Sequence, residues 1–543
     1  MSGAGGGARG ERILAFDLGT GGCKAALYDA AGACLADAVR GYPTRHPASG
    51  RDEQRPEDWW QAIVGATAEL LARTGADPAQ VAALSLSGQS LALLPLDGDG
   101  ELLTEWCPIW SDARAGAQAA AVFAEVGEER WYLTTGNGFP PPLYTAFKLM
   151  WLREQAPETF ARTRLALGSK DWVNLRLCGR VATDPSYASG SGVWNLERGD
   201  YDGDLLAATA IDRGLLPDPV ASSEVLGGLL PAAAEALGLR AGTPVVAGGV
   251  DNSCMAIGAR NVDPGDLYAS LGSSSWLTVT ARRPVLDAAN RPFTFASIVP
   301  GLHHSAMSTF GAGTSLAWVR DLVAPQLAGR EGGDAELIAL AADSPPGARG
   351  LLFVPSLGGG TMLEGGPDVR GGWVGLDLAH RPADLVRAAL EGIALALRRA
   401  HVALRAMTPT AEEVVAVGGG SLSPLWRQIY ADAWGIPLVK TTVDRNAATL
   451  GAAAAAAVGI GLWPSFDPVR DAHAAVERHR PQEPAASAYR ALAPLFERAA
   501  AAQAELGRAL APFRAAEGGG GGGAAGAGAG GDDGAGAVGG GGA

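Results

Sequence analysis

Several features that often mark a functional site are scarce in this chain of 543 residues. Its five cysteines include no C-x-x-C pair, which predicts reduced thiols in a cytoplasmic protein. Its seven histidines show no zinc-binding spacing, so we expect no transition-metal site made of protein ligands alone. The phosphate-loop pattern G-x-x-x-x-G-K-[ST] is absent, and Gly418–Ser421 does not fit G-x-G-x-x-G. A nucleotide site in this chain therefore needs a different construction.

Excess positive charge and long apolar runs are also lacking. Lysine and arginine number 43 against 57 acidic residues, a formal charge of −14, whereas nucleic-acid binding needs a basic surface. The apolar stretch Ala452–Leu462 is interrupted by glycine and is too short to span a bilayer. We therefore expect no nucleic-acid partner and no membrane segment.

Lysine itself is rare. Only Lys24, Lys148, Lys170 and Lys440 occur among the 43 basic residues. A compact ammonium group is not freely exchanged for a planar guanidinium. The lysines that remain are therefore of interest.

Strand-like segments alternate with helix-length segments, which is typical of an α/β protein. An apolar content of 47% in a chain of this length predicts two domains, each with its own core. Residues 1–10 are small, and we expect them to be flexible. Residues 516–543 are almost entirely glycine and alanine, which cannot offset the entropy of ordering, so we predict a disordered tail.

The two halves of the chain contain a similar hairpin. In the first half, strand Ile13–Phe16 leads through a turn rich in glycine and hydroxyl groups into strand Lys24–Tyr28. In the second half, strands Leu267–Leu271 and Trp276–Thr280 flank a turn of the same kind. Such turns present backbone N–H groups to an anion. The repetition predicts a duplicated domain with a shared cleft.

The first hairpin carries the groups that phosphoryl transfer needs. Asp17 can enter the shell of a metal ion, Thr20 can bind a phosphate oxygen, and Lys24 can neutralise charge. The same residues also suit an ordinary turn. The residues alone leave both interpretations open.

Asp251 is a second candidate, because it follows the predicted strand Thr243–Val250. Its carboxylate can accept the proton of a substrate hydroxyl. Aspartate is equally a preferred N-cap, here for a predicted helix over Asn252–Arg260. The residues alone favour neither interpretation.

Three further segments place small or polar residues at strand ends. Between strand Glu413–Val417 and a predicted helix over Pro424–Trp434, Gly418–Ser421 leaves room for a flat base and ribose, although an ordinary turn explains it as well. Ser85–Gln89 and Trp110–Arg114 offer an amide, a carboxylate and a guanidinium to sugar hydroxyls. Taken alone, each of these two segments is better explained by a surface ion pair or a capped helix.

From about Ile13 to about Arg514 the sequence resembles the FGGY carbohydrate kinases, and its pattern is most similar to xylulokinases. The resemblance rests on blocks that occur in the family's order: LAFDLGTGGCKAALYD, EQRPEDWW, SLSGQ, WSDAR, YTAFKLMWLREQAPE, SKDWVNLRLCGRVATDPSYAS, AGTPVVAGGVDN, DLYASLGSSSW, GAGTSLAWVRD, RGGWVGLDLAHRPADLVRAALEG and VGGGSLSPLWRQIYADAWGIPL.

The resemblance implies an α/β fold of two actin-like ATPase (ribonuclease H-like) domains, 11–260 and 261–515, with a deep cleft between them. It implies ATP and Mg²⁺ as cofactors and a small sugar as substrate, and it is compatible with a homodimer. Carried over by motif, Asp251 would be the catalytic base and Asp17 would hold the magnesium. The ATP-binding residues would be Thr20, Gly21, Lys24, Gly272, Ser273, Gly311, Gly313, Thr314, Gly419, Gly420 and Ser421. The sugar-binding residues would be Gln89, Trp110, Asp112, Arg114, Asp251 and Asn252.

The chain departs from the family pattern at several places. Ser273 stands where threonine is usual and keeps the hydroxyl group. Ser90-Leu91-Ala92 replaces the Met-His-Gly often found in xylulokinases, and Phe147 replaces a proline. The block LFVPSLGGGTMLEGGPDVRG lacks the Gly-Glu-Arg-Thr-Pro run common in relatives. These departures leave the identity of the sugar open.

We therefore expect an ATP-dependent phosphotransferase with an alcohol acceptor. D-xylulose is the first choice of acceptor, with D-ribulose, gluconate, a tetritol or another polyol behind it. Two other classes remain open: an ATP-binding regulator of the actin clan without sugar turnover, and a degenerate kinase that only binds sugar.

Overall fold

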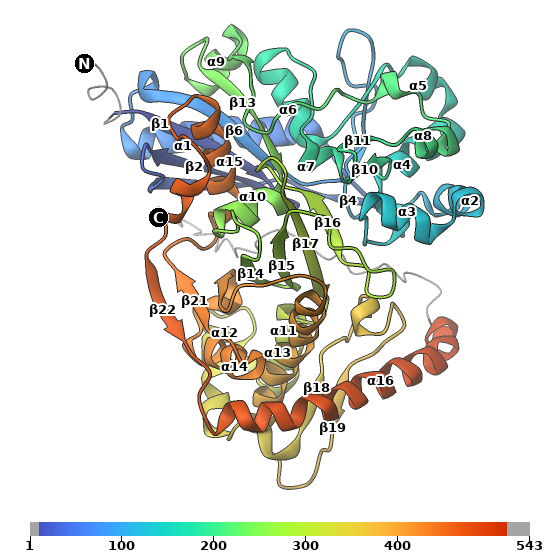
Figure 1. The fold of residues 1–543 in the computed structure, drawn as a ribbon, viewed down its shortest axis with the longest axis vertical. Helices are drawn as coiled ribbons and strands as arrows, with labels where there is room; N and C mark the ends of the chain where they lie inside the picture. The colour runs from blue at the N-terminus through green and yellow to red at the C-terminus, as the bar shows by residue number, and fades with distance from the viewer. Residues whose placement is uncertain (1–9, 518–543) are drawn as a thin grey trace, which may run out of the picture.

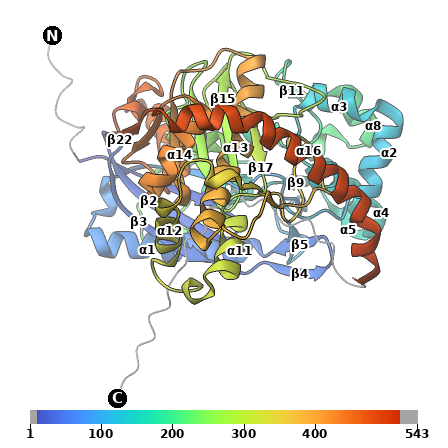
Figure 2. The same ribbon diagram turned by 90° about the horizontal axis from the view of Figure 1, so that it is seen from below.

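The computed structural model describes residues 10–517, which form two α/β halves (Figure 1). Residues 1–9 and 518–543, where flexible and disordered termini are predicted, lie outside the described residues. The C-terminal helix α16 (Ala485–Glu517) runs along the second half and includes the first two residues of the predicted tail (Figure 2).

A six-stranded sheet forms the centre of the first half, with strand order β12-β13-β6-β1-β2-β3. β13, β6 and β1 are parallel, whereas β12, β2 and β3 run antiparallel to their neighbours. The strands are β1 (Arg12–Leu18), β2 (Gly22–Asp29), β3 (Cys34–Gly41), β6 (Val81–Gly88), β12 (Val225–Gly228) and β13 (Pro244–Val250). The central strands β6 and β13 are buried almost throughout, as expected for parallel strands that are covered on both faces.

A seven-stranded sheet forms the centre of the second half, with strand order β16-β17-β15-β14-β20-β21-β22. Its strands are β14 (Leu267–Leu271), β15 (Ser275–Ala281), β16 (Phe293–Ala296), β17 (His303–Thr309), β20 (Val414–Val417), β21 (Leu438–Thr441) and β22 (Ala475–His479). Small sheets complete the strands: β4 (Arg45–Ala48) with β5 (Arg51–Gln54) and β8 (Cys107–Pro108), β7 (Leu94–Leu96) with β9 (Leu165–Leu167), β10 (Trp194–Asn195) with β11 (Asp200–Tyr201), and β18 (Leu352–Val354) with β19 (Gly372–Val374).

The two large sheets repeat one topology. In each, an antiparallel hairpin (β1–β2 or β14–β15) pairs in parallel, through its first strand, with a later strand (β6 or β20). That strand pairs in parallel with another (β13 or β21), and a further antiparallel strand (β3 or β17) follows the hairpin. The predicted duplication is thus confirmed. β14 has its predicted bounds, and the other three hairpin strands extend one or two residues further at each end.

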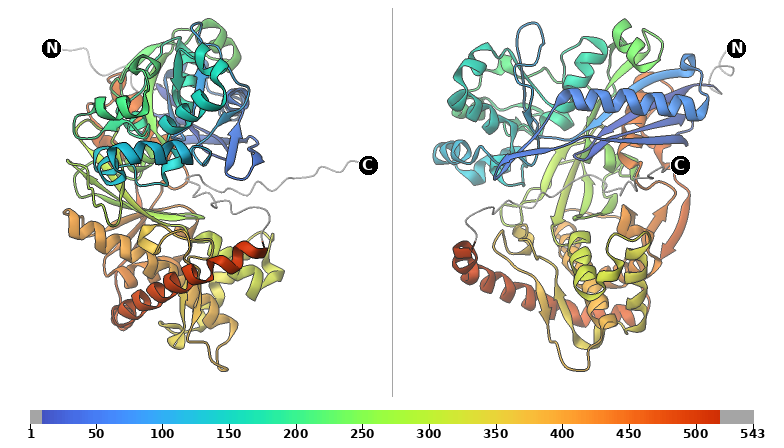
Figure 3. Two further views of the ribbon diagram at one scale, coloured as in Figure 1. Left: turned by 90° about the vertical axis from the view of Figure 1, so that its right-hand side faces the viewer. Right: turned by 180° about the vertical axis from the view of Figure 1, so that it is seen from behind.

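Helices cover both faces of the sheets (Figure 3). They are α1 (Pro56–Thr74), α2 (Gly116–Val126), α3 (Glu128–Thr135), α4 (Thr145–Gln155), α5 (Pro157–Arg162), α6 (Ser169–Cys178), α7 (Pro185–Ala188), α8 (Gly203–Thr209), α9 (Pro231–Leu237), α10 (Asp251–Gly258), α11 (Gly313–Val323), α12 (Gly333–Leu340), α13 (Pro382–Met407), α14 (Pro424–Trp434) and α15 (Ala447–Gly459). None of the helices within residues 10–517 is long and apolar enough to cross a membrane.

Alternating residues of β1 belong to different cores. Leu14 and Phe16 pack in the core that includes α1, whereas Ile13 and Ala15 pack in the core that includes α15. This is the period of two that a strand covered on both faces requires. The two helices therefore lie on opposite faces of the first sheet.

α15 follows the predicted domain boundary at 260/261 in the sequence, yet it packs on the first sheet (Figure 1). Its buried residues are mostly alanine, and Gly451 lies so close to α10 that a Cβ there would meet the carbonyl oxygen of Cys254 at 1.9 Å. Small side chains let α10 and α15 pack closely. The chain crosses between the halves more than once, so the division at 260/261 stays a proposal.

Candidate active site

The parallel strands β1, β6 and β13 end side by side and bring polar residues together. The strand register pairs Asp17 with Ser87, and Ser87 with Gly249. Asp251 begins α10 directly after β13. Ligand sites of open α/β sheets lie at the carboxyl ends of parallel strands. The predicted metal ligand and the predicted base are therefore at the same end of one sheet.

Asp251 is only 6% exposed. Its Oδ1 accepts hydrogen bonds from the backbone N–H of Asn252 (2.7 Å) and from the side-chain Nδ2 of that residue (2.9 Å). Burial and then the negative charge of Asp17 raise the pKa of Asp251 to about 8, and the bonds from Asn252 oppose this rise. A carboxylate with such a pKa is a stronger base than an exposed one.

The N-cap of α10 is Val250, and no side chain caps this helix. The interpretation of Asp251 as the N-cap of this helix is therefore wrong. The Oδ1 of Asp251 accepts the two bonds from Asn252, whereas its Oδ2 accepts no hydrogen bond within residues 10–517 and is available for a ligand at the sheet end.

Asp17 is partly buried, and Ser87 Oγ donates a hydrogen bond to its Oδ1 (2.7 Å). Burial raises the pKa of Asp17, although the Ser87 bond and the charge of Lys24 work against it. Ser87 has no role in the sequence-based prediction. The sequence signal for it is its place in the SLSGQ block. The structure adds that Ser87 pairs with Asp17 across β6 and β1 and donates a hydrogen bond to it.

The end of β13 has an unusual backbone. Gly248 has φ +73°, and a Cβ there would lie 1.9 Å from the carbonyl oxygen of Leu86 on β6. Only glycine fits this close approach. The N–H of Val250 donates to Ser186 Oγ (3.0 Å), which fixes the residue before Asp251.

A buried ion-pair network supports this strand end. Lys170 Nζ contacts Asp171 (2.6 Å), Asp184 (3.2 Å) and the carbonyl oxygen of Ala247 (3.2 Å). Ser186 Oγ donates to Asp184 Oδ2 (2.5 Å). The sequence identifies Lys170 only as a rare lysine, and it contains no signal for these partners.

The turn of the first hairpin, residues 19–21, is predicted to bind phosphate and is held in place by two hydrogen bonds. Thr20 Oγ1 accepts a hydrogen bond from Trp110 Nε1 (2.7 Å), and its carbonyl oxygen accepts one from Gln54 Nε2 (2.6 Å). Gly21 is exposed at the turn, with open space where a side chain would stand. Lys24 is paired with Asp17 in the sheet, but its Nζ donates to the carbonyl oxygen of Arg445, just before α15 (2.5 Å).

The turn of the second hairpin, residues 272–274, is also predicted to bind phosphate and contacts the start of α11. Gly313 N donates to the carbonyl oxygen of Gly272 (3.1 Å), and Thr314 N donates to that of Ser273 (3.0 Å). A Cβ on Gly313 would lie 2.6 Å from the Gly272 oxygen. The structure thus brings together four residues predicted to bind ATP phosphates.

Glu364 supports the predicted residue Gly311 and was missed by sequence reasoning. Its buried carboxylate accepts hydrogen bonds from Phe310 N (2.9 Å), Thr361 N (3.0 Å) and Ser356 Oγ (2.7 Å). Burial raises its pKa, and these bonds partly offset the rise. The surrounding block departs from the family pattern, so no motif pointed to this residue.

The predicted adenosine segment leaves β20 and leads into α14, whose predicted bounds are confirmed. Gly419 faces open space, whereas Gly420 lies against Leu271 of β14. Ser421 is buried, and its Oγ donates to the carbonyl oxygen of Gly418 (2.7 Å). Gly419 is therefore the residue best placed to face a flat ligand, and Ser421 closes the turn.

The predicted sugar residues divide into two sets. Gln89 is buried, its Nε2 donates to Gln54 Oε1 (2.9 Å), and its Oε1 has no partner within residues 10–517. Asp112 and Arg114 form a buried pair (2.6 Å), and Arg114 also binds Glu53 (2.6 Å). The charges of the second set neutralise one another, so only Gln89 keeps a free buried polar atom.

Asp251 lies where the two halves meet. α10 packs against α15, and its Ala256 shares a core with Tyr268 of β14 and Val417 of β20. Burial, and in part the charge of Asp251, raise the pKa of Tyr268 to about 12. Asp251 is therefore electrostatically coupled to Asp17 on a strand of the first sheet and to Tyr268 on a strand of the second.

The donor set fits a magnesium ion. Asp17 and Asp251 both have raised pKa values, and the charge of Asp17 contributes to the rise at Asp251. A cation beside them would relieve this repulsion. Mg²⁺ binds through one or two carboxylates, water and substrate phosphates. Asp17 is placed for that role.

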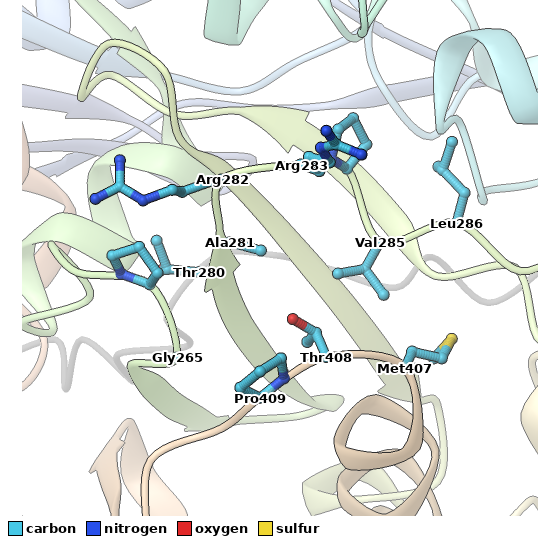
Figure 4. Close-up of a pocket in the computed structure, with 12 residues that line it drawn as sticks. Gly265, Thr280, Ala281, Arg282, Arg283, Val285, Leu286, Met407, Thr408 and Pro409 are labelled. Carbon is cyan, nitrogen blue, oxygen red and sulfur yellow. The ribbon is translucent and has the colours of Figure 1, made fainter.

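A separate pocket of about 470 Å³ lies at the end of the β14–β15 hairpin that is opposite its turn (Figure 4). It is lined by Thr280, by Arg282 and Val285 in the following loop, and by Met407 and Pro409 at the end of α13. None of the predicted site residues lines it.

Comparison with known proteins agrees with this geometry. The family model described as "FGGY family of carbohydrate kinases, N-terminal domain" matches residues 12–258, and that of the C-terminal domain matches residues 267–460. The chain is 30% identical to the xylulose kinase of Bacillus subtilis over 84% of this chain and 89% of that protein. It is 29% identical to the gluconokinase of the same organism over 89% of this chain and 94% of that protein.

A solved xylulose kinase from Rhodospirillum rubrum superimposes with a TM-score of 0.83 at 29% identity, covering 93% of this chain and 99% of that one. The related halves are thus the two domains of an actin-like ATPase fold. Because the two family models together match most of the chain, it belongs to the FGGY family of carbohydrate kinases, which transfer a phosphoryl group from ATP to an alcohol group of a sugar.

Proposed function

We propose that this chain phosphorylates D-xylulose with Mg-ATP and forms D-xylulose 5-phosphate. The observation that carries the proposed chemistry is the buried carboxylate of Asp251, with a pKa of about 8, beside Asp17 at the shared end of β1, β6 and β13. Similarity to xylulose kinases over most of both chains supports the choice of sugar.

In the proposed reaction, Asp251 accepts the proton of a terminal sugar hydroxyl. The hydroxyl oxygen forms a bond to the γ-phosphorus in line with the bond that breaks, and ADP leaves with that electron pair. The protein contributes positioning and electrostatics rather than covalent chemistry. A magnesium ion beside Asp17 would neutralise phosphate charge when it is bound.

We assign the phosphates to the two turns. Thr20 and Gly21 stand at the first turn, and Gly272, Ser273 and Thr314 surround the second. The backbone N–H groups of Gly21 and Ser273 and the hydroxyls of Thr20 and Ser273 are suited to phosphate oxygens, whereas the N–H groups of Gly272 and Thr314 donate to carbonyl groups of the turn. Lys24 Nζ donates to the carbonyl oxygen of Arg445 in the structure. Lys24 can therefore bind a phosphate only if this hydrogen bond breaks.

The sugar side of the site would use Gln89 and Trp110. The unpartnered Oε1 of Gln89 suits a sugar hydroxyl, which can donate to it. Asp112 and Arg114 would support the loop of Trp110 through their ion pair rather than contact the sugar. Asn252 orients the carboxylate of Asp251.

A coupled ADP-release assay over a panel of ketoses, polyols and sugar acids tests the function. We expect release that depends on D-xylulose and on Mg²⁺. Release without any sugar would favour an ATPase, and no release with any sugar would favour a binding module. Asp263→Asn changes an exposed carboxylate paired with Arg470. It is the matched control for Asp251→Asn and should behave as wild type in this assay.

Gluconate is the second candidate, because the chain is also similar to a gluconokinase over most of both lengths. Gluconate carries a carboxylate, so its recognition needs a cation that is free to pair with it. Turnover of gluconate at a higher kcat/KM than D-xylulose would replace the first proposal with the second.

We also infer a cytoplasmic location and propose a homodimer. The unpatterned cysteines, all of which are free in the structure, are consistent with a reducing compartment. Sedimentation of the purified protein tests the dimer, and a single species of 55.2 kDa would contradict it.

A further inference from the structure

Lys148 is a buried cation in an unfavourable place. It lies in the first turn of α4, is 0% exposed and forms no ion pair within residues 10–517. The first turn of a helix carries partial positive charge, which disfavours a cation. Burial lowers the pKa of Lys148 to about 7, and the nearby Asp112 and Arg114 have opposite, smaller effects. A buried charge without a counter-ion is costly, so its contacts need an explanation.

The ammonium group joins two loops. Lys148 Nζ donates to the carbonyl oxygen of Leu91 (2.9 Å) and to that of Ile109 (2.6 Å). The first carbonyl belongs to the loop between β6 and β7, and the second follows β8. Lys148 therefore bridges two segments that are not adjacent in the sequence.

The first loop is held in a strained conformation. Leu91 has φ +61°, a left-handed region that leucine rarely adopts, and its side chain is buried. Such backbone persists only where the surroundings impose it. In addition to the bond from Lys148, Thr145 Oγ1 of the same helical turn donates to the carbonyl oxygen of Ala92 (3.4 Å). This loop starts at Gln89, whose buried Oε1 is unpartnered.

The second loop reaches the first phosphate turn. The carbonyl oxygen of Ile109 accepts from both Lys148 Nζ and the N–H of Asp112 (3.1 Å), which closes the turn that contains Trp110. Trp110 Nε1 in turn donates to Thr20 Oγ1 (2.7 Å). A shift of Ile109 would therefore move both the proposed sugar-site indole and the hydroxyl at the phosphate turn.

We propose that Lys148 is a positioning residue of the acceptor site: by holding the carbonyl groups of Leu91 and Ile109, it keeps the loops of Gln89 and Trp110 at the separation that a small sugar needs. The inference rests on the proposed function, because it assigns those loops to the sugar. Lys148 does not touch the substrate in this proposal. It acts through the two loops.

Lys148→Met tests the proposal, since methionine has a similar length and no N–H donors. Without the bridge the loops separate, so we expect the KM for the sugar to rise at least about tenfold, while the KM for ATP stays within about twofold of wild type. Lys148→Arg keeps donors at this position and should return the sugar KM to within about threefold. Steady-state kinetics with each substrate varied in turn measure both constants.

Arg387→Met is the matched control. Arg387 is also a buried cation, but it pairs with Glu391 in α13 and bonds to Tyr489, away from the loops of Gln89 and Trp110. Its loss should lower Tm without changing the sugar KM selectively. If Arg387→Met and Lys148→Met gave the same pattern, or if Lys148→Met raised both KM values equally or neither, the positioning role would be wrong.

Two further outcomes are distinguishable. If Lys148→Met does not fold, Lys148→Gln replaces it, because glutamine keeps a polar head group but is too short to bridge both carbonyls; the same selective rise is expected. If wild type turns over no sugar of the panel, the proposed function fails. The role of Lys148 is then tested by calorimetry, which compares the Kd for D-xylulose of wild type, Lys148→Met and Arg387→Met. Wild-type turnover with an unchanged sugar KM in the variants overturns only the role of Lys148.

Discussion

The two halves share a sheet topology but differ in the chemistry of their hairpin ends. In the first half, the end of the sheet carries Asp17 and Asp251, whose pKa values are raised by burial. In the second half, the turn holds only glycine and serine, and its shape depends on backbone contacts with Gly313 and Thr314. The duplicated fold thus supplies reactive charge from one copy and a fitted backbone surface from the other. The predictions below test this division.

The largest effect is expected at the base. Asp251→Asn keeps the side-chain shape but cannot accept the proton, so kcat should fall by about 10²- to 10⁴-fold. ATP affinity should stay within about threefold, because the phosphate turns are unchanged. Steady-state kinetics and nucleotide titration measure both quantities. A loss of kcat smaller than about tenfold would show that Asp251 is not the base.

The next effect is expected at the second turn. In Gly313→Ala the new Cβ would meet the Gly272 carbonyl oxygen at 2.6 Å, so the turn has to move. We expect the KM for ATP to rise about tenfold while the KM for the sugar changes little. Gly203→Ala is the control, since nothing lies within 4 Å of its Cβ position. An equal rise in both KM values would contradict the division between the halves.

A pH profile sharpens the comparison further. Asp251 has a pKa of about 8 in the absence of ligands and must be deprotonated to act as a base. The kcat/KM for the sugar, measured with Mg-ATP present, should therefore rise with pH and reach its plateau at or below about pH 8, because a bound cation lowers the pKa of Asp251. At saturating ATP, the profile of Gly313→Ala should keep this midpoint and a similar plateau, because Gly313 does not touch Asp251. A midpoint near the ordinary aspartate pKa of about 4 would contradict the burial argument.

The smallest effect concerns stability. The folded-state pKa of Asp251 lies above its unfolded value of 3.8, so folding favours the protonated form. Its contribution to stability is present below about pH 4, declines as the pH rises and is lost above about pH 8. The neutral Asp251→Asn variant has no such dependence and should have a higher Tm than wild type at pH 8 but a similar one at pH 4. Thermal melts across this range measure the difference, and parallel curves would refute it.

Local sequence patterns predicted a large part of the fold. The hairpins were visible because apolar strands flank turns rich in glycine, and the bounds of β14 and α14 were predicted correctly. The packing of α15 on the first sheet was not predictable, because its alanines fit any close helix contact. A run of small side chains allows a helix to pack closely against another element, but it does not specify which element that is.

The candidate site divides in the same way. Asp17 and Asp251 stand near glycines at strand ends and were predicted on that basis, and the register of β1, β6 and β13 brings them to one end of the sheet. Ser87, Glu364 and the partners of Lys170 were missed, because their roles arise from contacts between distant segments.

By itself, the sequence determined the class of fold, the duplication and the residue types that phosphoryl transfer requires, since these depend on local period, turn chemistry and motif order. Only the tertiary structure decided that Asp251 is a buried carboxylate at the sheet end rather than a helix cap and that Asp112 forms an ion pair with Arg114. It also decided that Lys148 bridges two loops. The physical reason is that a pKa, an ion pair and a buried hydrogen bond depend on which distant groups share a site, and neighbours in the sequence do not specify those groups.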